Sequence, residues 1–200
     1  MSDLILDNSS QKILDTAKTL FWKYGIKRVS VEEICTEAGI SKMTFYRKFK
    51  NKGELVINLL TLIYEQGIAD YMEIMERDIP FPEKVNAIVL LKHQASQDLS
   101  QEFMKEVYQS EDAKLKSLMA TYVEKSQRQT RQDFTKAQQE GWIRSDLKMD
   151  SIFYLLGVIQ EKIFDQAFLA LHDNLHDAIM ELTNFFFYGV LNQTKAGGEN

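Results

Sequence analysis

The chain has 200 residues, of which 44% are hydrophobic and 26% charged, with a formal net charge of −5, as is typical of a soluble globular protein. Its apolar runs are shorter than the roughly eighteen residues of a membrane-spanning helix, and a single cysteine excludes an internal disulfide. The acidic N-terminus lacks the basic region of a secretory signal, so we expect a cytoplasmic protein with no membrane association.

A first helix is predicted after residues 1–8, which we expect to be frayed. Its apolar side chains recur at helical spacing until Gly25 closes the element, and they are Ile13, Leu14, Ala17, Leu20, Phe21 and Tyr24. We expect this helix to cover the structure that follows it in the chain.

Residues 31–55 are typical of a helix-turn-helix that runs into a third, longer helix. Ser30 and Glu33 have the spacing of a capping box, which satisfies two backbone amides at the start of the first of these helices. Gly39 stands where a helix ends in the left-handed conformation, and Ser41 is placed to cap the next helix. The turn that remains between them has the length that a helix-turn-helix requires.

The second helix of this motif, residues 42–49, divides its side chains between two faces. Phe45 and Phe49 are one turn apart and should pack inward. The outer face displays cations, a hydroxyl and a phenol, which suits the major groove of DNA. The alternative is an ordinary solvated face, because basic residues near a helix C-terminus also complement the helix dipole. The predicted DNA-binding residues are Lys42, Met43, Thr44, Tyr46, Arg47, Lys48 and Lys52.

The charge distribution favours the DNA-binding interpretation. Residues 1–53 contain ten Lys and Arg against six Asp and Glu, which gives +4, whereas residues 54–200 carry −9. A basic head on an acidic body is expected when one end of a protein alone meets phosphate.

The segment VEEICTEAGISKMTFYRKFKNKGEL resembles the DNA-binding signature of the TetR family of bacterial transcriptional regulators. The core of that signature stands here as Ala38, Gly39, Ile40, Ser41, Thr44, Phe45, Tyr46 and Phe49. Met43 departs from the family, in which small residues are common at this place, and so leaves the base preference open. The resemblance implies three partners, which are double-stranded operator DNA, a second copy of the chain and a small-molecule effector, and it implies no cofactor.

The rest of the chain predicts an all-α fold. Asn51 and Glu54 repeat the capping spacing at the start of a helix that runs to about residue 77, a length of roughly 39 Å that joins the two halves of the chain. Pro80 and Pro82 break the chain. Further helices are expected at residues 83–96, 100–109, 112–139, 149–171 and 175–192, followed by a disordered tail, KAGGEN. We therefore expect a helix-turn-helix domain at residues 1–53 and a helical regulatory domain at residues 54–200.

The regulatory domain offers two candidate functional surfaces. The last two predicted helices carry more apolar surface than one face each would need, which favours a dimer interface, with a deep monomer core as the alternative. Met and aromatic residues are dense in the middle of this domain, where helical spacing also suits an ordinary core. The family resemblance implies an effector pocket among them, which we assign to Tyr64, His93, Phe103, Met104, Tyr108, Tyr122 and Glu161.

Catalytic and metal sites are not predicted. The paired carboxylates are adjacent and lie on different helix faces, and the chain has no glycine-rich phosphate loop, so we do not expect an enzyme. His172 and His176 are four apart, but the loop expected between them breaks a shared face, and Cys35 belongs to a buried stripe. The sequence predicts a ligand-responsive repressor that binds a palindromic operator as a homodimer and is released by an inducer. The alternative is a DNA-binding protein of the same fold that recruits a protein partner and binds no small ligand.

Overall fold

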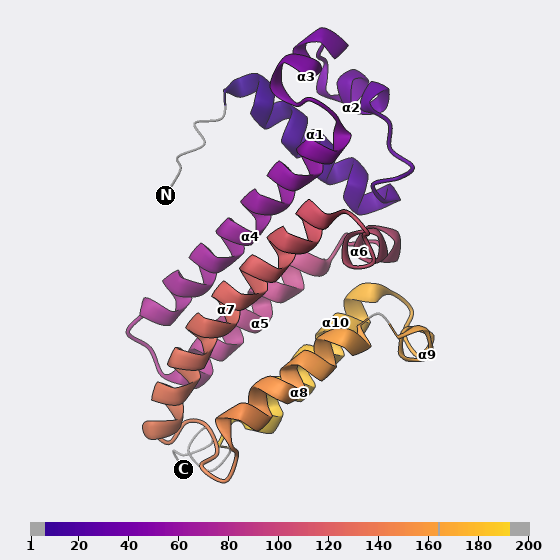
Figure 1. The fold of residues 1–200 in the computed structure, drawn as a ribbon. Helices are drawn as coiled ribbons and strands as arrows, with labels where there is room; N and C mark the ends of the chain where they lie inside the picture. The colour runs from indigo at the N-terminus through magenta and orange to yellow at the C-terminus, as the bar shows by residue number, and fades with distance from the viewer. Residues whose placement is uncertain (1–6, 164, 193–200) are drawn as a thin grey trace. The chain divides into compact units, whose positions relative to one another are not determined.

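The computed structural model describes residues 7–163 and 165–192, and within them the chain is helical (Figure 1). The described part holds no strand, only an isolated antiparallel bridge between Ile143 and Leu191, so the expected all-α class is confirmed. None of its helices combines the length and apolarity needed to cross a bilayer. The helices are α1 (Asn8–Tyr24), α2 (Val31–Ala38), α3 (Lys42–Lys48), α4 (Lys52–Glu76), α5 (Phe81–Ser96), α6 (Gln101–Tyr108), α7 (Ala113–Gln139), α8 (Met149–Lys162), α9 (Gln166–Leu169) and α10 (Leu175–Val190).

Two of the expected elements differ from the structure. The expected single helix over residues 149–171 is wrong, because α8 ends at Lys162 and the Asp165 carboxylate accepts hydrogen bonds from the amides of Ala167 and Phe168 to start α9. A short polar side chain that bonds to nearby amides favours a new helix start over a continuous helix. At the N-terminus, residues 7 and 8 are not frayed, since the Asp7 side chain caps α1. The expectations for residues 1–6 and for the tail lie outside the described residues.

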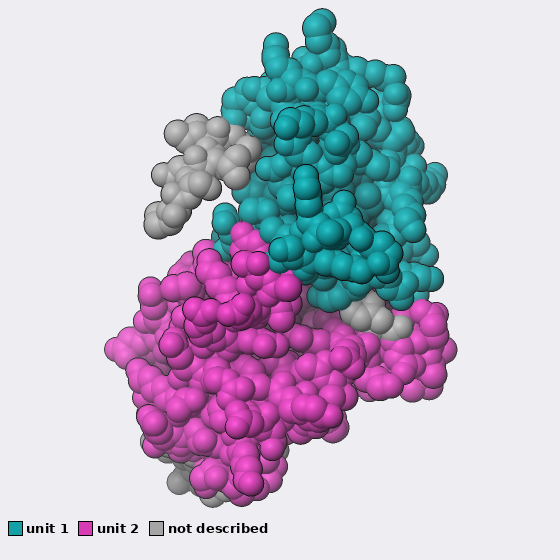
Figure 2. Space-filling model, viewed as in Figure 1, with its two compact units in different colours: residues 1–66, 98–119 teal, residues 67–97, 120–200 magenta. Residues whose placement is uncertain are grey.

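Contacts divide the chain into two compact units (Figure 2). Unit 1 comprises residues 1–66 and 98–119, and unit 2 comprises residues 67–97 and 120–200. This grouping differs from the expected boundary after residue 53, because α6 and the start of α7 bury Phe103, Val107 and Leu115 in the same hydrophobic cluster as the N-terminal helices. The helix-turn-helix is therefore supported by residues from a later part of the chain.

Unit 1 is built around α1. Phe21 of α1, Ile34 of α2 and Phe45 of α3 are fully buried in one cluster, to which α4 adds Leu55. This cluster fixes α1, α2, α3 and the first turns of α4 against one another, as the upper part of the ribbon in Figure 1 shows.

Unit 2 is organised around Phe134 of α7, which is 1% exposed. Its ring lies 5.8 Å from that of Phe81, 6.0 Å from that of Phe153, and 6.3 Å from those of both Phe186 and Phe187. One aromatic side chain thus joins α5, α7, α8 and α10 in a single core.

Candidate DNA-binding surface

The turn between α2 and α3 is defined by local hydrogen bonds. Gly39 has φ 63° and ψ 38°, its amide donates to the Thr36 carbonyl at 3.2 Å, and the Ile40 amide donates to the Cys35 carbonyl at 3.0 Å. This is the Schellman pattern, in which a left-handed glycine ends a helix. Ser41 then caps α3 by accepting from the Thr44 amide at 3.0 Å. Both features confirm the turn predicted from the sequence.

The start of α2 is closed by the predicted capping box. The Ser30 hydroxyl accepts from the Glu33 amide at 3.1 Å, and the Glu33 carboxylate accepts from the Ser30 amide at 2.7 Å. The hydrogen bonds that the Ser30 amide and hydroxyl donate to the Glu33 carboxylate lower the pKa of Glu33. The start of α4 is capped differently from the prediction, since Asn51 accepts from the Glu54 amide at 2.9 Å but the Glu54 carboxylate accepts from the amide of Lys50 instead of that of Asn51.

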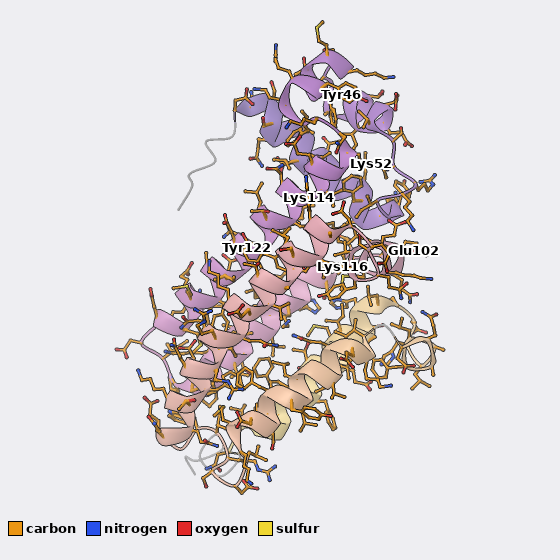
Figure 3. All side chains as sticks on the ribbon, in the orientation of Figure 1. Tyr46, Lys52, Glu102, Lys114, Lys116 and Tyr122 are labelled. Carbon is orange, nitrogen blue, oxygen red and sulfur yellow. The ribbon has the colours of Figure 1, made fainter. Side chains whose placement is uncertain are left out.

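The structure separates the two faces of α3 as expected. Phe45 is 0% exposed and Phe49 is 4% exposed, whereas Met43 is 79% and Tyr46 is 52% exposed. Arg47 is also exposed. Figure 3 shows Tyr46 on α3. A seven-residue helix held by the buried Phe45, and by Phe49 directly after it, thus displays a large apolar side chain, a phenol and a guanidinium on its outer face.

Two lysines of α3 are paired with carboxylates of the same unit. The Lys42 ammonium bonds to the carboxylate of Glu32 on α2, which lowers the pKa of Glu32 below its ordinary value of 4.5 and raises that of Lys42. Lys48 pairs with Asp7, the residue that caps α1, and its side chain is only 26% exposed. Glu32 and Asp7 were not identified as part of this surface from the sequence, because they lie 10 and 41 residues from their partners.

Thr44 and Lys52 also have bonds within unit 1. The Thr44 hydroxyl lies 3.0 Å from that of Ser41. The Lys52 ammonium, at the start of α4 (Figure 3), donates to the carbonyls of Ile26 and Val29, each at 2.8 Å. The predicted contact residues therefore fall into two groups, with Met43, Tyr46 and Arg47 displayed outward and Lys42, Thr44, Lys48 and Lys52 bonded to neighbours in unit 1.

The residues assigned to an effector pocket are spread over both units. Tyr64, Phe103, Met104 and Tyr108 belong to unit 1, and His93, Tyr122 and Glu161 belong to unit 2. Phe103 is 3% exposed and packs on Trp22 with ring centroids 4.3 Å apart. The His93 ring lies 4.6 Å from that of His176, and Glu161 is exposed. The pocket assignment stays a prediction.

A cleft of about 410 Å³ lies within unit 2, where α4 ends, α5 begins and α7 ends. Met75, Phe81 and Trp142 contribute its apolar wall, and Asp133 and Lys136 are among its charged residues. The seven residues predicted to form the pocket do not line it.

The outer faces of α8 and α10 expose large apolar side chains. Phe185 is 76%, Tyr154 73%, Tyr188 58% and Leu155 54% exposed. Phe186, by contrast, is 6% exposed in the core of unit 2. The surplus of apolar residues noted in the sequence is therefore divided between the core and an uncovered face.

The structure also places the histidine and cysteine candidates identified in the sequence. The Nδ1 atom of His172 lies 3.0 Å from the Phe168 carbonyl oxygen, and its Nε2 atom lies 3.2 Å from a carboxylate oxygen of Glu181. Among residues 7–163 and 165–192, no three His, Cys, Asp or Glu side chains are grouped to hold a metal ion. Cys35 is buried, and this burial raises the pKa of its thiol.

Comparison with known proteins relates the chain to transcriptional regulators. The profile of the family described as "Bacterial regulatory proteins, tetR family" matches residues 13–59. Over 147 residues, the chain is 24% identical to the HTH-type transcriptional repressor KstR2 of Mycobacterium tuberculosis strain H37Rv. The match covers 71% of this chain and 72% of that protein.

Solved structures share the fold. The ketosteroid transcriptional regulator KstR2 of M. tuberculosis superposes with a TM-score of 0.64 at 15% identity, over 94% of this chain and 97% of that one. The fatty acid degradation regulator FadR from Bacillus halodurans superposes with a TM-score of 0.69 at 15% identity, over 92% of this chain and 97% of that one. A transcriptional regulator from Saccharomonospora viridis in complex with choline gives 0.73 at 16% identity, over 92% and 98%.

Proposed function

Since this chain belongs to the TetR family of bacterial regulatory proteins, we propose that it is a ligand-responsive transcriptional repressor. It binds a palindromic operator as a homodimer and leaves the operator when a small molecule binds the regulatory part of the chain, residues 54–200. The observation that carries the proposal is the two-faced α3, which buries Phe45 completely while Met43 and Tyr46 stand 79% and 52% exposed. A helix displayed in this way fits the major groove of DNA.

We assign distinct roles to the three displayed side chains and to Lys42, which is paired with Glu32. Arg47 and Met43 face base edges, where a guanidinium recognises guanine and an apolar group contacts the thymine methyl. Tyr46 and Lys42 bind phosphates, which orients the helix without reading sequence. Lys42 must exchange its carboxylate partner, Glu32, for a phosphate when DNA binds.

The homodimer forms through the uncovered faces of α8 and α10. Tyr154 and Leu155 on α8 and Phe185 and Tyr188 on α10 are large apolar side chains that water contacts in the single chain. Exposed apolar patches of this kind mark partner sites, and the self-complementary occupant is a second copy of the same face. Two copies of α3 then meet two half-sites of a palindrome.

The effector acts on the regulatory part of the chain, and its influence reaches α3 through α4. This helix is continuous from Lys52 to Glu76, and residues 52–66 belong to unit 1 while residues 67–76 belong to unit 2. The names of similar proteins refer to a ketosteroid, to fatty acid degradation and to choline, which share no single chemistry, so the effector class is left open.

A randomised duplex library tests the DNA-binding function. The protein is expected to enrich an inverted repeat whose half-sites lie about one helical turn, roughly 10 base pairs, apart. Enrichment of no duplex would refute the proposal. A thermal-shift screen then distinguishes the two possible roles of the regulatory part of the chain, because an effector raises the apparent melting temperature by mass action, whereas a domain that only recruits a protein gives no shift with small molecules.

Replacing both Leu62 and Ile63 by glycine tests the route of coupling. Each glycine costs roughly 1 kcal/mol of helix stability in the middle of α4, and the packing of the Leu62 and Ile63 side chains on the core of unit 1 is lost in addition, so circular dichroism must first show that the variant folds. The variant should keep its separate affinities for DNA and for effector but lose the mutual weakening of one by the other. Full release of DNA by effector in this variant would show that the signal bypasses α4.

A further inference from the structure

The loop between α1 and α2 is held from two sides by side chains of opposite charge. The Glu106 carboxylate of α6 accepts hydrogen bonds from the amides of Ile26 and Lys27, the latter at 3.0 Å. The Lys52 ammonium of α4 donates to the carbonyls of Ile26 and Val29, each at 2.8 Å. The N–H and the C=O of Ile26 are thus both bonded to charged groups, which come from two other helices of unit 1.

One face of α6 is fixed to the end of α1. Ser100, Phe103 and Glu106 are spaced three residues apart, so they lie on the same side of the helix. The Ser100 amide donates to the Trp22 carbonyl at 3.0 Å, and the Phe103 ring packs on the Trp22 ring at 4.3 Å. A Cβ at Gly25 would lie 3.1 Å from the Glu106 carboxylate, so a glycine at this position permits the close approach.

The loop determines where the helix-turn-helix begins. It ends at Ser30, the N-cap of α2, and α2 carries α3 through the turn at Gly39. Hydrogen bonds to a charged acceptor are stronger than neutral ones, and a partly buried amide that loses its acceptor is costly. Without the Glu106 carboxylate, the amides of Ile26 and Lys27 would lose this acceptor, and of the two charged groups only Lys52 would still hold the loop.

We propose that Glu106 is a positioning residue for DNA binding, which holds the loop between α1 and α2 in the conformation that places α3 for the operator. It lies 80 residues from Ile26 and outside the helix-turn-helix. The inference rests on the proposed DNA-binding function. It also makes a prediction opposite to that of simple electrostatics, because removing a carboxylate near a DNA-binding domain should by charge alone strengthen binding to phosphate.

The test compares Glu106→Met, Glu106→Gln and the control Glu102→Gln in the full-length chain. The methionine has a similar size but no acceptor, and the glutamine keeps one neutral acceptor oxygen. Glu102 is an exposed residue of the same helix, so its glutamine variant loses the same charge. Affinity for the duplex enriched by the wild type is measured by fluorescence anisotropy, at a temperature where circular dichroism shows every variant fully folded.

We expect Glu106→Met to bind the duplex about tenfold more weakly than wild type, Glu106→Gln to fall between them, and Glu102→Gln to bind at least as tightly as wild type. Amide hydrogen exchange gives a second readout that needs no DNA, and it should accelerate at Ile26 and Lys27 most in Glu106→Met, less in Glu106→Gln and not in Glu102→Gln. Equal affinities for Glu106→Met and Glu102→Gln, or unchanged exchange at the two amides, would overturn the inference while leaving the proposed function intact.

Failure of the wild type to enrich any duplex would instead refute the proposed function, and the exchange readout would still decide whether Glu106 holds the loop.

Discussion

Two glycines with positive φ provide a matched test of how unit 1 is held together. Gly39, which ends α2, has φ 63° and ψ 38°, and a Cβ there would meet no atom within 4 Å. Gly25, which ends α1, has φ 81° and ψ 164°, and a Cβ there would lie 3.1 Å from atoms of both Glu102 and Glu106. The first site isolates backbone strain, and the second adds crowding against α6.

The two alanine variants should therefore differ in stability. Gly39→Ala is expected to lower the free energy of unfolding by about 1 to 2 kcal/mol, the cost of a left-handed conformation for an L residue. At Gly25 the φ and ψ values fall in a region that is essentially restricted to glycine, which costs roughly 1 to 3 kcal/mol. Moving α6 to relieve the added Cβ costs about 1 to 3 kcal/mol more, so we expect a total of about 2 to 6 kcal/mol for Gly25→Ala.

Urea denaturation at one fixed protein concentration measures both changes, and an unchanged slope with denaturant shows that only stability has changed. Gly39→Asn serves as the control, because asparagine tolerates the left-handed region and should destabilise less than alanine. If Gly25→Ala proved as stable as Gly39→Ala, or more stable, the view that α6 packs tightly on the end of α1 would be refuted.

Three further predictions concern DNA affinity, assembly and pH. Glu32→Gln should tighten DNA binding in an anisotropy titration by removing the carboxylate that competes with phosphate for Lys42, and an unchanged affinity would show that Lys42 does not reach DNA. Phe185→Glu should give a folded monomer by light scattering and circular dichroism, because this side chain is 76% exposed in the single chain, and a persistent dimer would contradict the interface. Asp7→Asn keeps a capping side chain but loses the ion pair with Lys48. That pair lowers the pKa of Asp7 below 3.8, so its contribution to stability is present above this value and lost as the pH falls through the lower folded pKa. The free energies of unfolding of wild type and Asp7→Asn should therefore converge as the pH falls. An equal difference between them at neutral and acid pH would contradict a stabilising role for the ion pair.

Local chemistry made the helix-turn-helix predictable. The positions of Ser30, Gly39 and Ser41 each follow from a hydrogen-bonding requirement that involves residues only a few positions away, and the structure shows these bonds. The inward packing of Phe45 and Phe49 follows from their spacing. These features needed no knowledge of the rest of the chain.

Features that depend on distant partners were not predictable in the same way. Three consecutive phenylalanines at residues 185–187 are equally apolar, and only packing against distant residues such as Phe134 determines that Phe186 is buried while Phe185 is exposed. Apolar periodicity continues past Lys162 and hides the new helix start at Asp165. The amides bonded by Glu106 lie about 80 residues away, and no local motif marks that pairing.

The most direct test of the account is a titration of the enriched duplex by wild type, Arg47→Ala and Lys125→Ala at several salt concentrations. Both variants remove one exposed positive charge, but Arg47 lies on α3 of unit 1 and Lys125 on α7 of unit 2. Arg47→Ala is predicted to weaken binding by about 1 to 3 kcal/mol and to relax base preference at one position of each half-site, with Lys125→Ala equal to wild type. Equal effects of the two substitutions would contradict the claim that α3 is the surface that reads DNA.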